Sequence, residues 1–371
     1  MPKIIFQLKY LFYLIRKRKF KTLYNYLWVY PLWIFYPLRT FIIAKVFKFL
    51  KYNPYPPFVE IEPTTFCNLR CKMCEHTYWL EPNRHMSFEE FKQIVDQFPK
   101  LKWAGLTGIG ESLLNSDFLK MVKYLKETSN PIVEVIDNFL LLKKDITTQL
   151  IKYGVDEMFC SMAGATKETY QRIMDGSNLD TVLKNIKDFD TAKKEFNSFT
   201  PILSFHYIIS KENIKEAEMF LDLVYSLGVE FFEVYYTPLL HGFEEVKSSF
   251  LEEFTEDLKQ RLEKKGKELG IYVGFNLSSK SNKPPVKLCS NWIMPFIFVT
   301  GEVIPCCVEN EGNRREAQKN YALGNVFQEK FKDIWYGEKY TKFRKLIREN
   351  KIPSQCTHCP IYNIHGGNGS S

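Results

Sequence analysis

Three cysteines have the spacing of a metal-cluster site. Cys67, Cys71 and Cys74 fall within eight residues, separated by three and then by two others. Thiolate ligands select zinc or an iron–sulfur cluster, and structural zinc prefers four ligands in two paired units. A [4Fe–4S] cluster held by three cysteines leaves one iron open, and a catalytic metal needs an open position. The spacing therefore favours a catalytic iron–sulfur cluster, with a zinc knuckle as the alternative.

A second set of cysteines lies in the last quarter of the chain. It supplies four thiolates, the number that closes the coordination of a [4Fe–4S] cluster or a zinc ion. These four are Cys289, Cys306, Cys356 and Cys359. A predicted hairpin over 296–307, with its turn at 301–302, brings residues near 289 and 306 together. Cys307 is a spare thiol, and either it or Cys306 can be the ligand.

Composition and cysteine use favour a reducing compartment. The chain has 371 residues, 45% hydrophobic and 25% charged, which excludes a disordered chain or a small disulfide scaffold. Its first twenty residues contain a short apolar run, but basic residues 16–19 follow it without a small-residue cleavage site. We therefore expect a cytoplasmic protein whose clustered cysteines bind metal or act chemically before they form disulfides.

The elements that must position these cysteines alternate between strand and helix. The predicted helix at 87–98 begins with a Ser-x-x-Glu capping box, formed by Ser87 and Glu90. Alternation of this kind predicts a parallel α/β sheet, either doubly wound or curved into a barrel. The strands are expected at 58–62, 103–107, 132–136, 158–162, 202–209, 231–236 and 271–275. The helices are expected at 87–98, 116–128, 144–152, 167–174, 179–196, 215–227, 251–269 and, after a polar boundary at 278–285, 333–350.

The first cysteine trio, placed directly after the first strand, strongly resembles that of the radical S-adenosylmethionine (SAM) superfamily. The resemblance implies a partial (β/α)6 TIM-like barrel and a cluster whose open iron binds SAM. It also implies reductive cleavage of SAM to a 5′-deoxyadenosyl radical that abstracts hydrogen from a substrate. The family usually has an aromatic residue before the third cysteine, where this chain has Met73.

Two further motifs resemble the SAM-binding segments of that family. Thr107-Gly-Ile-Gly-Glu resembles its glycine-rich loop, which implies that Gly108, Gly110 and Glu111 help to seat SAM. A strand that ends in Ser161-x-x-Gly-Ala-Thr resembles the subgroup with SPASM or twitch domains. That resemblance implies a contact between Ser161 and SAM, and Arg172 is a candidate partner for the SAM carboxylate.

The second cysteine set resembles the start of the SPASM motif. The full motif has seven cysteines, whereas nothing after Cys359 supplies the rest, so one auxiliary [4Fe–4S] cluster is expected, with structural zinc as the alternative. The resemblance gives three regions: an N-terminal arm at 1–53, a radical SAM core at 54–277 and an auxiliary-cluster domain at 286–371.

The resemblance implies an oxidoreductase that dehydrogenates or modifies a sugar or alcohol, a lipid-linked compound or a peptide. It also implies a flavodoxin- or ferredoxin-type reductant. Redox-neutral epimerisation is the alternative and needs a hydrogen donor such as the thiol of Cys160 or Cys307. His206, on the fifth strand, is a further catalytic candidate, although core packing is the favoured interpretation of both Cys160 and His206. A two-cluster electron-transfer protein is the non-enzyme alternative.

The N-terminal arm is basic and aromatic. Residues 1–59 contain 11 Lys or Arg and no carboxylate, so the rest of the chain is slightly acidic. An apolar stretch at 23–38 is too short for a membrane span and contains Pro31 and Pro37. Basic aromatic helices of this kind favour binding to an anionic membrane surface, here the inner face of the membrane. Packing on the body is the second alternative, and nucleic acid is the least favoured partner.

Overall fold

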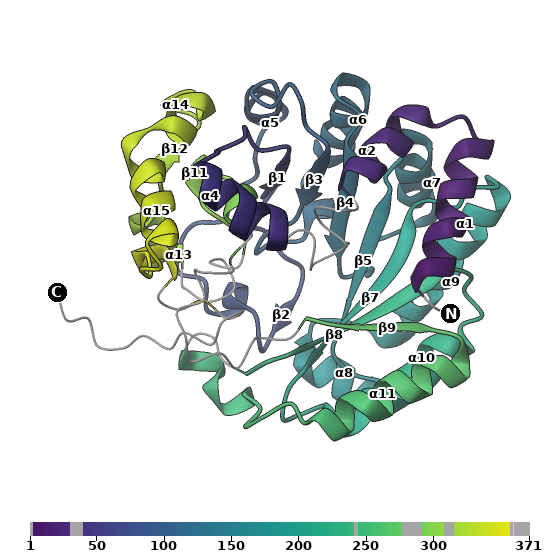
Figure 1. Ribbon diagram of the computed structural model, residues 1–371. Helices are drawn as coiled ribbons and strands as arrows, with labels where there is room; N and C mark the ends of the chain where they lie inside the picture. The colour runs from purple at the N-terminus through teal and green to yellow at the C-terminus, as the bar shows by residue number, and fades with distance from the viewer. Residues whose placement is uncertain are drawn as a thin grey trace.

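The computed structural model describes residues 3–29, 40–240, 244–276, 289, 291–307, 315–356 and 359. The predicted boundary at 278–285 and residues 30–39 of the arm lie outside these ranges. Figure 1 shows a curved sheet whose outer face carries a layer of helices, with the C-terminal helices beside one edge. Among the described residues the first and last strands of this sheet do not pair with each other, so no closed barrel is seen.

One sheet of ten strands runs through the molecule in the order β12-β11-β10-β1-β3-β4-β5-β7-β8-β9. All neighbours from β10 to β9 pair in parallel, whereas β10, β11 and β12 pair antiparallel. The predicted partial barrel is confirmed. Its strands are β1 Phe58–Ile61, β3 Trp103–Leu106, β4 Ile132–Asp137, β5 Glu157–Met162, β7 Ile202–Ile209, β8 Phe232–Pro238, β9 Tyr272–Phe275, β10 Phe296–Ile297, β11 Glu302–Ile304 and β12 Gly324–Asn325.

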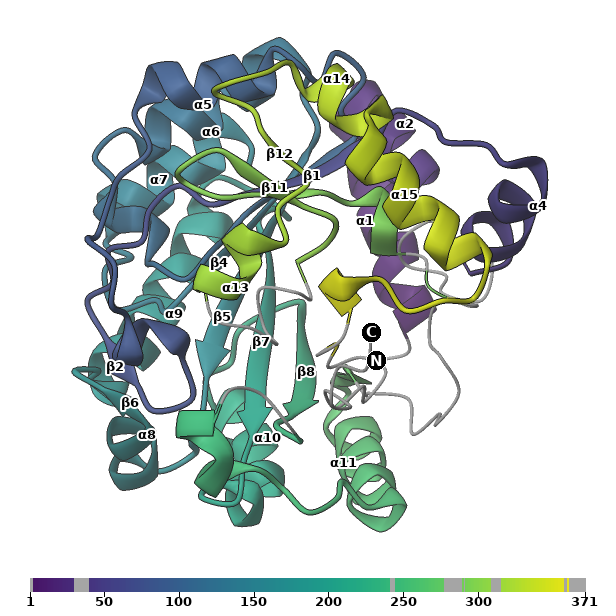
Figure 2. The ribbon, with the colours of Figure 1, turned by 90° about the vertical axis from the view of Figure 1, so that its left-hand side faces the viewer.

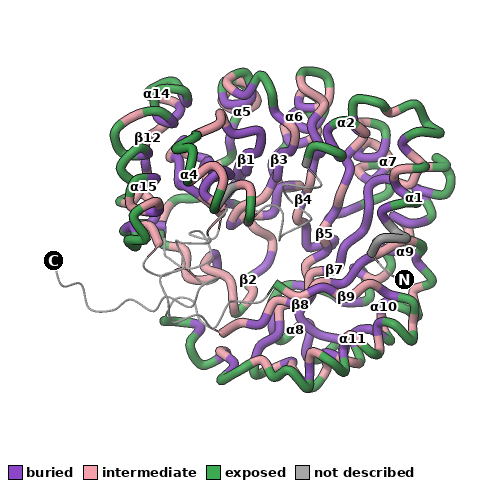
Figure 3. The backbone as a smooth tube through the Cα atoms, in the orientation of Figure 1, coloured by how far each residue is buried: buried purple, intermediate pink, exposed green. Residues whose placement is uncertain are grey.

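Helices connect the parallel strands and cover one face of the sheet. The covered face holds the apolar core, as the buried strands in Figure 3 show. Ser87 caps α5 with the predicted reciprocal bond to Glu90. The helices of this layer are α5 Phe88–Val95, α6 Phe118–Thr128, α7 Lys144–Tyr153, α8 Lys167–Ile173, α9 Leu179–Glu195, α10 Ala217–Ser226 and α11 Glu256–Leu269, with short turns η4 Ser112–Leu114, η5 Ile214–Glu216 and η6 Glu244–Ser249.

The C-terminal region differs from its prediction in two respects. Its hairpin adds β10 to the edge strand β1, so the main sheet continues into it. The single helix expected at 333–350 was wrong, because Gly337 separates α14 Phe331–Tyr336 from α15 Glu338–Arg348. A Cβ at Gly337 would lie 2.5 Å from the Asp333 carbonyl oxygen. The other helical segments are η8 Asn291–Ile293, α13 Arg315–Asn320 and η9 Ser354–Cys356.

The arm packs against the body through one face. It contains α1 Lys3–Arg16, α2 Phe20–Val29, η2 Thr40–Phe47 and α4 Lys48–Leu50. Tyr10 and Leu14 of α1 are fully buried, and Asn25 of α2 donates to the Asn130 carbonyl at 2.8 Å. Asn130 precedes β4, so these helices cover the ends at which the strands begin. In the described ranges no helix is long and apolar enough to span a membrane.

Candidate active site

The first cysteine trio lies on a loop that begins where β1 ends. Cys71 belongs to the short strand β2 Arg70–Cys71, which pairs with β6 Met174–Asp175. Cys74 caps the turn η3 Glu75–Tyr78, and its amide donates to the Cys71 carbonyl at 3.0 Å. Figure 2 shows the β2–β6 pair beside the ends of the parallel strands. The short ladder therefore holds the cysteine loop against the body.

The donor set and its surroundings fit an iron–sulfur cluster. Burial raises the pKa of the Cys67 and Cys71 thiols, and it raises the pKa of Cys74 to about 12. Such thiols ionise only when a positive group compensates, as a metal centre does. Within the described ranges no three His, Cys, Asp or Glu side chains converge closely enough for a single metal ion. A cubane of eight atoms holds its thiolates farther apart than one ion does.

The glycine-rich loop after β3 lies directly on the cysteine loop. A Cβ at Gly110 would lie 2.4 Å from the Thr64 carbonyl oxygen and 2.6 Å from that of Phe66. The amide of Glu111 also donates to the Phe66 carbonyl at 2.7 Å. Only a glycine permits this approach of two backbones. The structure therefore brings the two predicted segments together.

Glu111 is buried and ties the ends of three strands together. Its carboxylate accepts from the amides of Leu113 and Asn138, at 3.3 and 3.0 Å. Burial and the neighbouring Asp137 raise the pKa of Glu111 well above its ordinary value. The Asn138 side chain donates to Asn68 of the cysteine loop at 2.9 Å. These contacts give Glu111 a positioning role beneath the cysteine loop.

The face of the sheet away from the helices carries the next group of predicted residues. Ser161 of β5, His206 of β7 and Tyr235 of β8 occupy one register across three strands. They are partly exposed, whereas the residues that alternate with them are buried. The helices cover that buried face, so the three side chains lie on the inner face of the partial barrel.

His206 is held through one ring nitrogen. Its Nε2 lies 2.6 Å from the Oγ1 of Thr237, which also accepts from the Asn276 amide at 3.1 Å. Burial lowers the pKa of His206 to about 4, so the ring is neutral near pH 7. When Nε2 carries the hydrogen and donates it to Thr237, Nδ1 is left with a lone pair.

Two other predicted residues lie elsewhere. Cys160 is fully buried on the face that the helices cover, so its thiol points away from the inner face. Arg172 of α8 donates to the Glu212 carbonyl at 3.3 Å and lies 3.8 Å from the Glu212 carboxylate. Glu212 also binds Lys72, next to Cys71, at 3.2 Å. Arg172 therefore reaches the outside of the cysteine loop through Glu212.

Two family models match the chain in the regions where these cysteines lie. The radical SAM superfamily model matches residues 61–224, which include the first trio, and the SPASM iron–sulfur cluster-binding domain matches residues 289–360, which include the second set. The chain is a radical SAM enzyme with a SPASM domain. Proteins with these two domains use SAM, a SAM-binding [4Fe–4S] cluster and auxiliary iron–sulfur clusters.

Curated relatives and solved structures agree with this family. A tungsten-containing aldehyde ferredoxin oxidoreductase cofactor-modifying protein of Pyrococcus furiosus is 26% identical, over 82% of this chain and 87% of its own length. A probable GTP 3′,8-cyclase of Saccharolobus islandicus is 27% identical over 46% of this chain and 54% of its own length. SuiB of Streptococcus suis bound to S-adenosylmethionine has the same fold, with a TM-score of 0.61 and 15% identity over 89% of this chain and 76% of SuiB.

The SPASM cysteines lie at the ends of its short elements. Cys306 and Cys307 follow β11, Cys356 ends η9, and Cys289 precedes η8. Cys359 donates its amide to the Cys356 carbonyl at 3.3 Å. The assignment of Cys289, Cys306, Cys356 and Cys359 as ligands of the auxiliary cluster stays a prediction, and so does the choice between Cys306 and Cys307.

Sequence reasoning missed a buried ion pair that joins the SPASM domain to the radical SAM core. Arg315 of α13 donates to Glu62, at the end of β1, through both terminal nitrogens, at 2.9 and 2.6 Å. Both side chains are almost fully buried. Glu62 also accepts from the amides of Ile109 in the glycine-rich loop and Val299 near the hairpin turn. A Cβ at Gly108 would lie 2.3 Å from the Glu62 side chain, so this glycine makes room for the pair.

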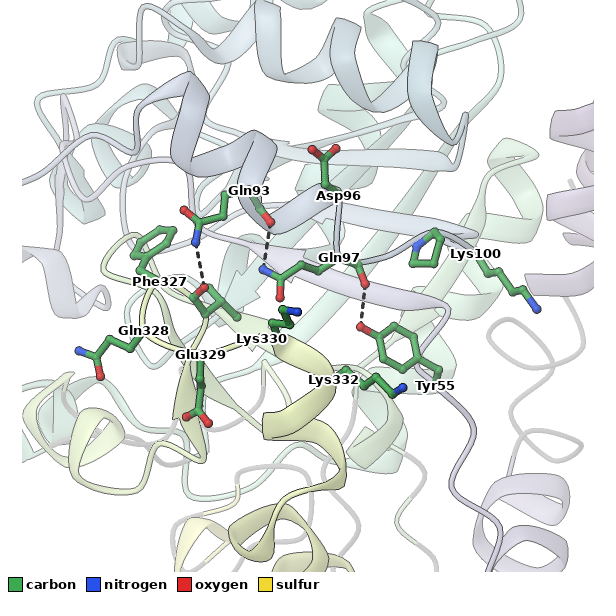
Figure 4. A pocket seen from close by; sticks show the side chains of 12 residues that line it. Tyr55, Gln93, Asp96, Gln97, Lys100, Phe327, Gln328, Glu329, Lys330 and Lys332 are labelled. Carbon is green, nitrogen blue, oxygen red and sulfur yellow. Dashed lines mark hydrogen bonds between the residues drawn. The ribbon is translucent and has the colours of Figure 1, made fainter.

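A separate cavity lies away from these residues. It is a groove of about 810 Å³ between α5 and the segment that joins β12 to α14. Figure 4 shows Gln93 and Gln97 of α5 extending across this groove, with Tyr55 at one side. Gln93 donates to the Val326 carbonyl at 3.3 Å, and Gln97 accepts from the Phe331 amide at 2.5 Å. We interpret the groove as part of the junction between the SPASM domain and the core.

Proposed function

We propose that this radical SAM enzyme oxidises a hydroxyl-bearing substrate, with Cys67, Cys71 and Cys74 holding the SAM-binding cluster. The observation that carries the proposal is the neutral His206 on the inner face. Oxidation of an alcohol to a carbonyl removes one hydrogen atom from carbon, one proton from oxygen and one electron. When bound, the cofactors supply the radical that takes the hydrogen atom and an iron–sulfur acceptor for the electron. The hydroxyl proton requires a base, and the Nδ1 of His206 accepts that proton.

The residues around His206 support this assignment. Thr237 holds Nε2, which fixes the ring and directs the opposite nitrogen away from it. Ser161 is its neighbour on β5, so a hydroxyl residue lies beside the base on that side, whereas the hydroxyl of Tyr235 on β8 donates to Glu233 at 2.7 Å. Hydroxyl groups of this kind can orient a polar substrate. We propose that Ser161, Gly110 and the backbone beside it face SAM, with Glu111 positioning them.

Epimerisation receives less support. A redox-neutral epimerase must return a hydrogen atom to the substrate, and a thiol is the side chain that can supply it. Cys160 lies under the helices, on the opposite face from His206. Cys307, the other candidate donor, lies in the SPASM domain.

The relatives' names give two substrate classes. One relative modifies a cofactor, and SuiB has been solved with a precursor peptide. The polar inner face of this chain fits a small hydroxyl compound, or a peptide that presents such a group. We propose a flavodoxin- or ferredoxin-type protein as the external reductant. The test is anaerobic turnover with carbinol-deuterated sugars, polyols and serine peptides. Deuterium in 5′-deoxyadenosine, together with a product that has lost the carbinol deuterium and the hydroxyl hydrogen, supports oxidation, whereas a product of unchanged oxidation state contradicts it.

Replacing His206 with phenylalanine should separate hydrogen abstraction from oxidation. The base is lost but SAM cleavage is not, so deuterium should still enter 5′-deoxyadenosine while oxidised product falls by about 10²-fold or more. In the wild type, the rate of oxidation should not change with pH through this ring above about pH 5. The rate should fall as the pH decreases toward 4, because the pKa of His206 is about 4 and a protonated ring cannot accept the proton. Product formation across about pH 3.5–8 measures this.

Thr237→Val is the matched variant for that experiment. It removes the hydroxyl that holds Nε2 but keeps the shape of the side chain and His206 itself. We expect a smaller loss of product and an acid limb at a different pH, because the ring loses its partner. Equal product formation by wild type and His206→Phe would exclude His206 as the base.

We also propose that the arm binds an anionic membrane surface. One face of the arm packs on the body, but its other face exposes large apolar side chains. On α1, Leu8, Phe12 and Ile15 are 59, 67 and 52% exposed at helical spacing. On α2, Phe20 and Tyr24 are 61 and 56% exposed. The positive charge of the arm complements anionic lipid, so we assign this exposed apolar face to contact with a membrane surface.

Replacing Leu8 and Phe12 with serine should weaken membrane binding without unfolding the protein. Both side chains are exposed, so folding does not depend on them. Burying a Leu or Phe in an apolar phase contributes about 1.5–3 kcal/mol each, so the bound fraction on phosphatidylglycerol vesicles should fall at least about tenfold. Flotation of the full-length protein measures it.

A substitution elsewhere gives the control for vesicle flotation. Tyr225 on α10 is 56% exposed but lies outside the arm. Tyr225→Ser should float like the wild type. Deleting the arm is a poor test, because Tyr10, Leu14 and Tyr26 are buried against the body and truncation would uncover their partners. A wild-type protein that does not float, or a serine variant that floats equally, would reject membrane binding.

A further inference from the structure

A cationic cleft lies where the arm meets two helices of the barrel. It has a volume of about 510 Å³ and is lined by the α1–α2 turn, the last turns of α6 and α7, and the loops that follow them. Six of its lining residues are basic and two are acidic: Arg18, Lys19, Lys21, Lys123, Lys126 and Lys152 against Glu127 and Asp156.

Only part of this positive charge is neutralised inside the protein. Lys126 pairs with Asp156 at 2.8 Å, and both side chains are largely buried. Lys123 approaches Glu127 at 3.7 Å. Arg18, Lys19, Lys21 and Lys152 form no ion pair within the part of the chain that the structure describes. Four positive charges therefore remain at one cleft. Such a concentration of charge attracts anions.

The positions of the arm's cations oppose local stability. Lys21 lies in the first turn of α2, where the helix dipole disfavours a positive charge, and that turn contains no acidic residue. Arg18 has a φ of 55°, in the left-handed region that favours glycine. The position of Lys21 is therefore unfavourable for an isolated α2, whereas Arg18 lies in the C-terminal cap of α1, where the Arg18 and Lys19 amides donate to the Ile15 and Leu14 carbonyls.

The cleft also adjoins the exposed apolar face of the arm. Phe20 lines it and is 61% exposed, and Tyr24 continues the same stripe one turn farther along α2. A ligand that fits both features carries concentrated negative charge next to an apolar chain. A phospholipid headgroup at a membrane surface combines the two, whereas a soluble phosphate offers only the charge.

We infer that the cleft between the α1–α2 turn and the ends of α6 and α7 binds the phosphomonoester headgroup of an anionic lipid. The inference deepens the proposed membrane binding by assigning a headgroup site to it. Diffuse attraction depends on surface charge alone, but a built cleft prefers a compact dianionic phosphate to the same charge spread over several headgroups.

The test uses phosphatidic acid as its phosphomonoester probe. Flotation on phosphatidylcholine vesicles that contain phosphatidic acid is compared with flotation on phosphatidylserine vesicles of equal surface charge. Titration calorimetry with short-chain phosphatidic acid below its micelle concentration then measures the cleft without a bilayer. We expect preference for phosphatidic acid in flotation, and saturable binding of the short-chain lipid.

Two variants separate the cleft from general charge. Arg18→Gly keeps the left-handed backbone and Lys21→Gln keeps the helix, so the double variant should fold. Each lost cation should weaken short-chain lipid binding by about fivefold. Lys187→Gln, on the exposed face of α9, removes one positive charge elsewhere, as each single cleft variant does, and should have no effect.

The outcomes distinguish the cleft from the membrane proposal. Equal flotation on both lipids, with no short-chain binding, would overturn the cleft and leave membrane binding intact. Short-chain binding without flotation would support the cleft and overturn the membrane surface. Binding of glycerol phosphate as tight as that of short-chain phosphatidic acid would overturn a lipid as the ligand. Equal loss in the Lys187→Gln variant would overturn the cleft as well.

Discussion

Replacing Cys71 with alanine should abolish 5′-deoxyadenosine formation, down to the level of a protein-free blank. Cys71 lies at the centre of the trio, on the strand that pairs with β6. Two thiolates do not hold a [4Fe–4S] cluster in place of three, so SAM loses its binding iron. Iron should fall from about eight to about four atoms per chain after anaerobic reconstitution, because the SPASM cluster keeps its own ligands. Iron analysis and product assay on one sample measure both.

Cys160→Ala provides the matched control for that loss. This cysteine is fully buried under the helices and belongs to neither set. Alanine leaves a small cavity, which costs about 1–2 kcal/mol of unfolding free energy, but iron content and 5′-deoxyadenosine formation should remain at the wild-type level. A Cys71→Ala protein that retains full iron content and full 5′-deoxyadenosine formation would show that the trio does not hold the cluster. Four iron atoms and one zinc atom per wild-type chain would instead show that the SPASM site binds zinc and not an iron–sulfur cluster.

Local sequence patterns predicted the sheet well because they act over short distances. Apolar runs such as 202–209 and 132–136 are buried on at least one face wherever they pair, so each became a strand. The capping box at Ser87 formed for the same reason, since both partners lie within one helical turn. The cysteine trio could likewise be placed after the first strand from its position alone.

Contacts between distant segments could not be predicted in this way. The segment around Arg315 reads as an ordinary solvated helix, and nothing local indicates that its guanidinium meets Glu62, 253 residues away. The addition of β10 to β1 depends on the same docking of the SPASM domain. The arm shows a related limit. Its sequence alone does not show which apolar side chains are buried, because Tyr10 and Leu14 are buried only through their contact with the body.

Replacing Arg315 with alanine should destabilise the protein more than any exposed substitution. The change leaves the Glu62 carboxylate buried without its partner, which costs about 3–5 kcal/mol, or roughly a 5–10 °C fall in melting temperature. It also removes the guanidinium that lies 3.7 Å from the centre of the Phe298 ring. Thermal unfolding of the reconstituted protein measures the first effect. Because Glu62 also binds the Ile109 amide, SAM affinity should fall as well.

Two further variants decide why the pair matters. Lys319→Ala breaks a neighbouring pair with Glu81 that is about one-third exposed, and it should cost less than about 1 kcal/mol. Combining Glu62→Gln with Arg315→Met removes both charges at nearly constant volume, so it should recover most of the lost stability. If stability returns but SAM binding does not, the pair acts by holding the glycine-rich loop rather than by strengthening the fold. An Arg315→Ala variant that is no less stable than Lys319→Ala and binds SAM like the wild type would show that the pair does neither.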